Sequence, residues 1–212
     1  NRYNIKNFMQ QQHKIEVRND NFFVRGYVVL DDGGDSYDMT FTGVNINRTW
    51  KDDNTWFGEY VGEYVLATLA GASNEAAHAA GLAAAQEGYL EPGSAGFKEA
   101  FDKVVQDPNL LTGSKFQDSS KYYHADANYN FSHLIDFADI QIGGSFRRYN
   151  LNSAGTIYTD TDGPISYSEA GLYTQIQESF EMSDEASLKL TGSVRYDKSE
   201  FFDGNFSPRL SA

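Results

Sequence analysis

Residues 186–197, ASLKLTGSVRYD, alternate between apolar and polar side chains along their whole length. Two other segments follow the same pattern, residues 121–131 (KYYHADANYNF) and residues 138–150 (ADIQIGGSFRRYN). A period of two residues indicates a β-strand, because successive side chains of a strand point to opposite faces of the sheet. The sequence therefore predicts a sheet with one apolar and one polar face.

The length and aromatic content of these strands are typical of a transmembrane β-barrel. Such barrels are built from segments of about ten residues with alternating hydrophobicity, flanked by aromatic residues at both membrane interfaces. The chain contains 14 Tyr and 15 Phe, and several of them lie at the ends of the predicted strands. The mean hydropathy is only −0.54, which a barrel tolerates because only every second strand residue faces lipid.

Charge and composition argue against several function classes. The formal net charge of −13 is unfavourable for binding nucleic acid, since no basic stripe neutralises phosphates. The absence of Cys removes disulfides and thiolate metal sites. We find no catalytic triad order, nucleophile elbow or phosphate-binding loop, and we expect neither an enzyme nor a cofactor. The four histidines show no metal-ligand spacing; they are His13, His78, His124 and His133.

The alternation predicts an all-β fold of about eight antiparallel strands. Residues 39–49 fit least well, because their apolar residues fall on both faces. The chain begins without a start signal and stops within a new alternation, so we expect part of a longer protein whose strands form an open, curved portion of a barrel wall. The predicted strands span residues 11–18, 22–30, 39–49, 121–131, 138–150, 167–180, 186–199 and 205–212.

Loop lengths give this sheet an orientation. Outer-membrane barrels have short periplasmic turns and longer extracellular loops. The short connections at 132–137 and 182–185 therefore predict the periplasmic rim, and the long ones at 51–120 and 151–166 the extracellular rim. Strand parity then places the turn at 31–35 on the periplasmic rim, and the tight turn at Asn19 and Asp20 on the extracellular rim.

Residues 51–120 change to a helical pattern. Helices are expected at 56–69, at 75–87 after a Ser73 cap, and at 95–106 after Pro92-Gly93-Ser94. Because helices cannot continue a barrel wall, this segment predicts an extracellular insertion. In the other long loop, Asp160-Thr161-Asp162-Gly163 lacks the twelve-residue ligand pattern of a calcium loop and is interpreted as a turn.

Six charged residues occupy polar positions of the predicted strands and are expected to face the lumen. They fit either a hydrated interior with compensating charges or a surface that contacts a plug or a permeating ligand, and the sequence leaves both open. These lumen-facing candidates are Arg25, Arg147, Glu169, Lys189, Arg195 and Arg209.

Several motifs carry a family resemblance. The clearest are residues 190–198 (LTGSVRYDK) and 206–211 (FSPRLS), with shorter ones at 2–7 (RYNIKN), 23–27 (FVRGY) and 47–51 (NRTWK). Together they resemble the barrel of TonB-dependent outer-membrane receptors, in the type that carries an upstream carboxypeptidase-regulatory-like domain. The resemblance covers nearly the whole chain, 1–212, with 51–120 as a loop insertion within it.

The resemblance implies a barrel of about 22 strands in the outer membrane of a Gram-negative-type envelope. It implies that a plug domain of the same protein fills the lumen and binds a scarce small ligand, and that the TonB complex pulls on this plug. The partners expected for the chain are outer-membrane lipid, the plug domain and an unknown small ligand. The TonB complex would be reached only through the plug, which lies outside this sequence.

The sequence leaves two other functions open. A small porin-like, structural or adhesive outer-membrane barrel could close with eight strands, and it would pair residues 205–212 with residues 11–18. A soluble secreted β-sandwich binding module would have strands of about 5–6 residues and would bury its apolar face.

Overall fold

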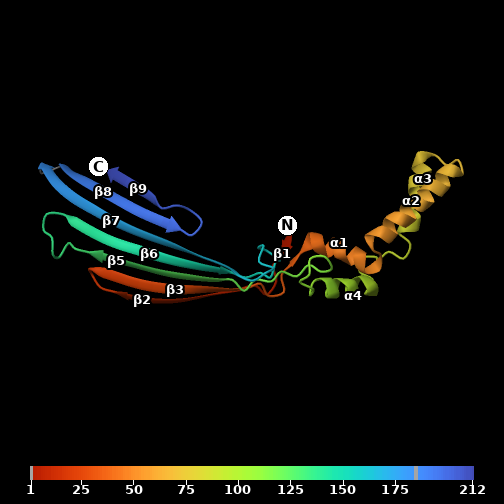
Figure 1. Ribbon diagram of the computed structural model, residues 1–212, viewed down its shortest axis with the longest axis horizontal. Helices are drawn as coiled ribbons and strands as arrows, with labels where there is room; N and C mark the ends of the chain where they lie inside the picture. Colours follow the sequence, from red (N-terminus) through yellow and green to blue (C-terminus); the bar gives the residue numbers. More distant parts are fainter. Residues whose placement is uncertain (1, 184–185) are drawn as a thin grey trace. The chain divides into compact units, whose positions relative to one another are not determined.

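The computed structural model describes residues 2–183 and 186–212. They form two compact units, each continuous in space but not in sequence. The sheet unit comprises Met9–Asp32 and Asp118–Ala212, and the insertion unit comprises residues 2–8 and Gly33–Gln117. Figure 1 shows long neighbouring strands in the first unit and the helices of the second.

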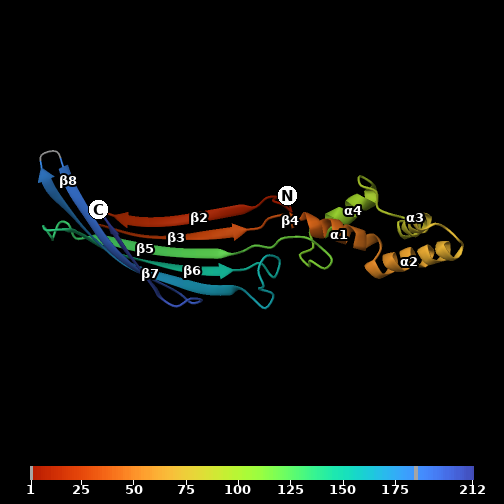
Figure 2. The same cartoon turned by 90° about the horizontal axis from the view of Figure 1, so that it is seen from above.

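The sheet unit is one antiparallel sheet in which almost every strand pairs with the next one in sequence, in the order β2-β3-β5-β6-β7-β8-β9. Figure 2 shows several of these strands side by side. Most have the length needed to cross a membrane at a tilt. The seven strands are β2 (Met9–Arg18), β3 (Phe22–Asp32), β5 (Lys121–Asn130), β6 (Asp139–Leu151), β7 (Ile165–Ser183), β8 (Ala186–Ser199) and β9 (Asn205–Ser211).

The sheet is open, as the sequence predicts. β2 and β9 are its two edges, and the described residues show no pairing between them. The closing pair that a small eight-stranded barrel requires is therefore absent from the described part of the chain. Unpaired backbone groups at an edge cost several kcal/mol each in hydrocarbon, so this sheet needs further strands before it can span a bilayer.

The prediction of a strand at 39–49 was wrong, and the sheet has seven strands instead of eight. Residues Met39–Trp50 form helix α1. The Asp38 carboxylate starts the helix by accepting hydrogen bonds from the backbone N–H groups of Thr40 and Phe41, as an N-cap residue does. The buried residues Thr42, Asn45 and Ile46 have helical spacing, which the strand interpretation overlooked.

This correction reverses two predicted turn positions. β3 pairs directly with β5, with Phe22 opposite Tyr129 and Leu30 opposite Lys121. The turn at 19–21 therefore lies at the same rim as the connection 131–138, and the turn at 31–35 lies at the opposite rim. We call these the short-turn rim (19–21 and 131–138) and the long-loop rim (33–120, 152–164 and 200–204). The predicted turn at 182–185 includes residues 184 and 185, which lie outside the described residues.

The insertion unit contains four helices and a two-stranded sheet among its described residues. β1 (Tyr3–Asn4) pairs with β4 (Tyr37–Asp38), directly before α1. The three predicted helices are confirmed, as α2 (Asp53–Leu69), α3 (Asn74–Ala85) and α4 (Ala95–Val104), and Ser73 and Ser94 cap the last two. None of the described helices combines the length and the apolar character needed to cross a membrane.

Two small contacts hold the helices together. Ile46 of α1 packs against Ala100 and Val104 of α4 in the buried core. On α3, Ala77 and Ala85 are fully buried, and Gly81 lies close to α2, because a Cβ at Gly81 would stand 2.7 Å from the Tyr60 carbonyl oxygen. Small residues thus permit the close packing of α2 and α3.

Candidate functional site: the polar face of the sheet

The strand register divides the sheet into two chemically different faces. Residues directly opposite each other in neighbouring strands share a face. One such row across β3, β5, β6, β7, β8 and β9 is polar or small: Arg25, Asp126, Ser145, Gly171, Asp197 and Asn205. The adjacent row on the other face consists of Val24, Ala127, Gly144, Leu172, Tyr196 and Phe206.

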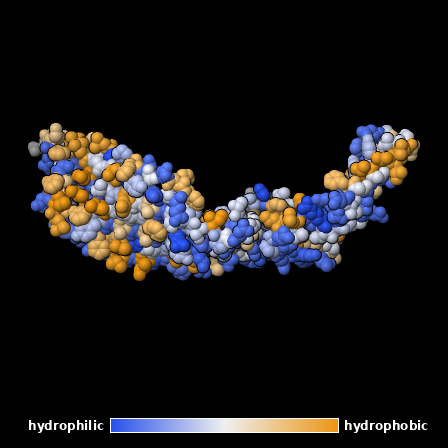
Figure 3. Space-filling model, in the orientation of Figure 1, coloured by the Kyte–Doolittle hydropathy of each residue, from blue (hydrophilic) through white to orange (hydrophobic). Residues whose placement is uncertain are grey.

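The apolar face remains exposed. Leu210 is 83%, Ile15 74% and Leu172 66% accessible, and Figure 3 shows hydrophobic residues across the strands of the sheet unit. An apolar surface of this extent marks a membrane or protein contact. It does not fit a soluble β-sandwich, which would bury this face.

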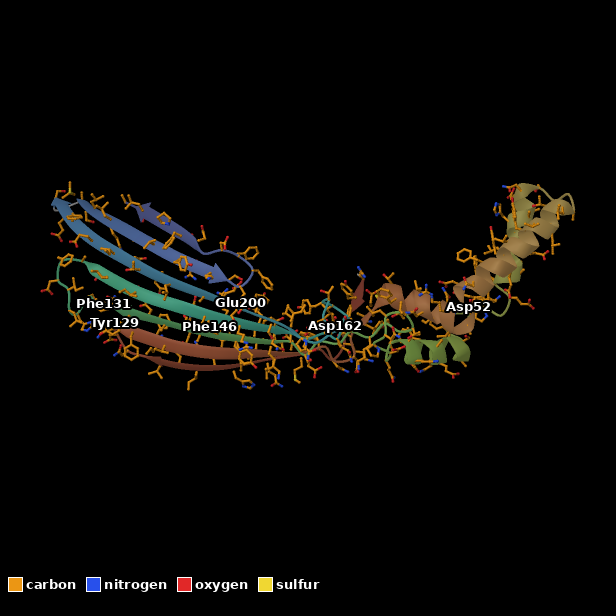
Figure 4. The ribbon with its side chains drawn as sticks, viewed as in Figure 1. Asp52, Tyr129, Phe131, Phe146, Asp162 and Glu200 are labelled. Carbon is orange, nitrogen blue, oxygen red and sulfur yellow. The ribbon has the colours of Figure 1, made fainter. Side chains whose placement is uncertain are left out.

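Aromatic side chains mark the short-turn rim. The rings of Tyr129 and Phe131 lie 4.7 Å apart, and Tyr129 also contacts the ring of His133 in the turn. Figure 4 shows Tyr129 and Phe131 near one end of the strands and Asp162 beyond the other end. Aromatic rings of this kind prefer the interface between hydrocarbon and water.

All six lumen-facing candidates have the register of the polar face, and three of them meet. Arg147 lies opposite Glu169, and both line a cleft of about 310 Å³ together with Arg195. We call this the β6–β8 cleft; Ser145, Asp197 and Asp203 also line it. Arg25, Lys189 and Arg209 lie elsewhere on the polar face.

Charge pairing organises the β6–β8 cleft. The Arg195 Nε atom donates to both carboxylate oxygens of Asp197, at 2.8 and 2.6 Å. This pair lies against Gly171, where a Cβ would stand 2.4 Å from Asp197 Oδ1 and 2.5 Å from Arg195 Nη2. Tyr149 places its hydroxyl 3.5 Å from Glu169 Oε2. The absence of a side chain at Gly171 therefore leaves the space that the ion pair of Arg195 and Asp197 occupies.

A second network, which the sequence did not reveal, joins the cleft to β3. Arg25 donates to Asp126 through two atoms, at 2.6 and 2.8 Å. His124 Nε2 lies 3.2 Å from Asp126 Oδ1, and Arg147 Nε donates to His124 Nδ1 at 3.2 Å. Because guanidinium is always a donor, Nδ1 is the unprotonated nitrogen and Nε2 carries the proton toward Asp126. The alternation places His124 and Asp126 on the polar face, but only the register shows their partners.

Ring packing on the polar face continues toward the long-loop rim. Tyr149 stacks on Tyr167 at 4.5 Å, and Tyr167 contacts Phe201 of the β8–β9 loop at 4.8 Å. Farther along β7, the ring of Tyr173 covers Gly143, where a Cβ would stand 2.4 Å from Tyr173 Cζ. Tyr173 also accepts a hydrogen bond from Asn128 at 2.7 Å. These contacts hold the tyrosine rings of the polar face in defined positions.

The loop 152–164 is organised by the carboxylate of Asp160. It accepts hydrogen bonds from the Ser153 hydroxyl at 2.7 Å and from the N–H groups of Ala154 and Gly155 at 3.1 and 2.7 Å. Burial acts to raise the pKa of Asp160, but the hydrogen bonds from Ser153 and Gly155 outweigh it and lower the pKa to about 2. The loop's own donors occupy both oxygens, which agrees with turn chemistry. The described residues contain no group of side chains that could hold a metal ion.

Comparison with known proteins agrees with this geometry. Residues 3–212 match the family described as TonB dependent receptor-like, beta-barrel. No curated protein and no solved structure matches the chain. Proteins of the matching family act in transport at the outer membrane and are not enzymes. Since the match covers nearly the whole chain, the chain belongs to this family and forms part of the β-barrel of a TonB-dependent receptor.

Proposed function

We propose that the chain forms roughly a third of the wall of a barrel of about 22 strands, in a receptor that takes up a scarce ligand with energy from the TonB complex. The two-faced sheet is the observation that carries this proposal. Its exposed apolar face, with Leu172 and Ile142, suits contact with outer-membrane lipid. Its polar face, with Arg25, Lys189 and Arg209 among others, suits a hydrated lumen.

The corrected topology supports one orientation of the sheet in the membrane. The connections 19–21 and 131–138 join strands at one rim, while the segments 33–120 and 152–164, together with the short connection 200–204, join strands at the other. Since extracellular loops are the longer ones in outer-membrane barrels, the long-loop rim faces the outside of a Gram-negative-type envelope. The insertion unit then stands at the cell surface, and the turn at Asn19 and Asp20 faces the periplasm.

The β6–β8 cleft is the part of the polar face that we assign to contact with the plug domain or the permeating ligand. Arg147, Glu169 and Arg195 offer both charge signs within one cavity. Such a mixed surface can pair with polar groups of a plug and exchange them for water when the plug moves. The plug belongs to the same full-length protein, and the TonB complex acts on the barrel only through it.

The motif resemblance also supports an upstream carboxypeptidase-regulatory-like domain in the full-length protein. Residues 190–198 and 206–211 carry this part of the proposal. Sequencing of the complete reading frame tests it directly, because that domain and a TonB box should be encoded before the plug.

Comparative depletion of the growth medium tests the uptake function. Three strains are grown in parallel: wild type, a strain without this receptor and a strain without TonB. A medium component that disappears only in the wild type identifies the ligand and supports energised uptake. Depletion that requires the receptor but is unchanged without TonB would instead indicate a passive, porin-like barrel.

A further inference from the structure

The insertion unit contains a cavity of about 310 Å³ at the junction of α1, α2 and the end of α3. Both tryptophans of the chain, Trp50 and Trp56, line it. Phe57 and Tyr89 complete the aromatic wall, and they are 61% and 38% exposed. A core would bury four such rings, whereas here they surround an open pocket. We call it the aromatic pocket.

The rings of the aromatic pocket are held in different orientations. Trp50 meets Tyr89 edge to face, with centroids 5.7 Å apart, and Trp56 meets Phe57 in the same way at 5.0 Å. Tyr60 stacks on Trp56 at 5.5 Å with nearly parallel planes. Neighbouring contacts thus fix the ring positions in advance, so little ordering remains for a ligand to impose.

Lys51 supports this arrangement without leaving a free charge in the pocket. Its ammonium group lies 4.7 Å from the Trp50 ring centroid, donates to the Ala85 carbonyl at 2.9 Å and pairs with Glu59. The pocket carboxylate, Asp53, is paired with Arg48 at 2.7 Å. The charges around the pocket are therefore compensated, which disfavours a strongly anionic or cationic ligand.

Two side-chain amides provide polar contacts. Asn47 and Gln86 line the aromatic pocket and are exposed, and among the described residues neither side chain makes a hydrogen bond. Each amide offers two N–H donors and one carbonyl acceptor. A ligand with hydroxyl groups, which both donate and accept, matches this pair better than a purely apolar molecule.

We propose that the aromatic pocket binds a neutral saccharide. The C–H face of a pyranose ring is apolar and stacks on indole or phenyl faces, while its hydroxyls pair with amides such as Asn47 and Gln86. A pocket with aromatic walls and a few polar groups is the usual form of a small-molecule site. This inference rests on the proposed function, since a saccharide site at the cell surface would serve a receptor that takes up its ligand.

Binding by the purified full-length receptor in detergent tests the site. The receptor is screened against an array of neutral oligosaccharides, and the strongest binder is measured by titration calorimetry. Trp50→Ala and Trp56→Ala should each weaken binding at least tenfold, and Trp56→Phe should retain part of the affinity. The matched control is Phe137→Ala, which removes an exposed aromatic residue that lies outside the pocket.

Exposed-residue variants keep the test decisive if a tryptophan variant fails to fold. Asn47→Ala and Gln86→Ala alter exposed amides and should each weaken binding several-fold, with unchanged helix content by circular dichroism. The absence of any neutral oligosaccharide ligand, or binding that is unaffected by all four alanine variants in the pocket, would overturn the proposal.

Binding and uptake separate the two proposals, because binding in detergent needs no TonB. Saccharide binding that depends on Trp50 and Trp56, combined with TonB-independent uptake, would reject energised transport and keep the pocket. TonB-dependent uptake of another class of compound, with no saccharide binding, would reject the pocket alone.

Discussion

Arg25 and Asp126 form an ion pair through two hydrogen bonds, of 2.6 and 2.8 Å, although 101 positions separate them in the sequence. They lie directly opposite each other in β3 and β5, the two strands between which the chain makes its long excursion. A guanidinium that donates two hydrogen bonds to one carboxylate gains geometric specificity as well as binding energy. The pair thus joins two strands that no tight turn connects, and we expect it to stabilise their register.

Coupling between these two residues is the first prediction. Arg25→Ala and Asp126→Ala should each lower the free energy of unfolding, and the double variant should lower it by less than the sum. Denaturant titration of the full-length receptor in lipid vesicles measures the three values. Arg25→Ala combined with Arg209→Ala is the additive control, because these two residues share no contact. Full additivity of the Arg25 and Asp126 changes would show that the pair does not set the register.

The two faces of the sheet should differ in their tolerance of charge. Ile142→Arg and Leu190→Arg place a guanidinium on the apolar face and should each cost about 2–4 kcal/mol if they lie near the bilayer midplane. The neighbouring changes Gln141→Arg and Thr191→Arg lie on the polar face and should cost much less. Unfolding titrations in vesicles compare the four variants, and equal costs on both faces would reject the lipid assignment.

Labelling of intact cells tests the orientation of the two rims. Single cysteines at Glu87 and Asp162, both exposed, should react with a membrane-impermeant maleimide, because they belong to the connections of the long-loop rim. A cysteine at Asp20 should stay unlabelled until the outer membrane is opened. If only the cysteine at position 20 is labelled in intact cells, the orientation is the reverse of the one proposed here.

Gly143 should be intolerant of a side chain. Its Cβ would collide with the Tyr173 ring, which the hydrogen bond from Asn128 holds in place, so Gly143→Ala should cost about 1–3 kcal/mol through overpacking. Gly192→Ala is the matched control, because the nearest atom to its Cβ is 4.0 Å away. Tyr173→Ala in the same chain should relieve part of the cost at Gly143. A loss of stability that is equal at the two glycines would contradict the overpacking explanation.

Acid should open the loop 152–164. The pKa of Asp160 is lowered to about 2, so its carboxylate stabilises the loop fully above its ordinary pKa near 4. This contribution is lost as the pH falls from about 4 through about 2. Pepsin should therefore cut the loop much faster at pH 2 than at pH 4, relative to another exposed site. Asp160→Asn should already speed cleavage by proteinase K at neutral pH, by roughly tenfold or more. A variant with the same cleavage rate as the wild type would show that Asp160 does not hold the loop.

The sequence predicts the strands after residue 120 well, because one face of the sheet is apolar and the other polar, which gives each strand a period of two. It fails at 39–49, where residue type and tertiary packing favour different structures. Phe41, Val44 and Ile46 are residue types that favour strands, whereas the helix is set by the Asp38 cap and by packing of Ile46 on Val104. That tertiary contact cannot be read from the segment itself.

The candidate site shows the same division between local and long-range information. Alternation places Arg147, Glu169 and Arg195 on one face, because parity is a local property. Alternation does not reveal that these three residues line one cleft, or that His124 accepts a hydrogen bond from Arg147. Those relations depend on the stagger between strands, and the sequence between them leaves that stagger open.

The segment 33–120 leaves the sheet at the end of β3 and returns to it at the neighbouring start of β5. At that point the Asp31 N–H donates to the Ser120 carbonyl at 3.0 Å, and β3 and β5 continue side by side as if a tight hairpin joined them. The continuity of the wall does not depend on what the intervening residues form. The wall therefore sets one requirement for this segment, which is that its two ends meet beside Asp31 and Ser120.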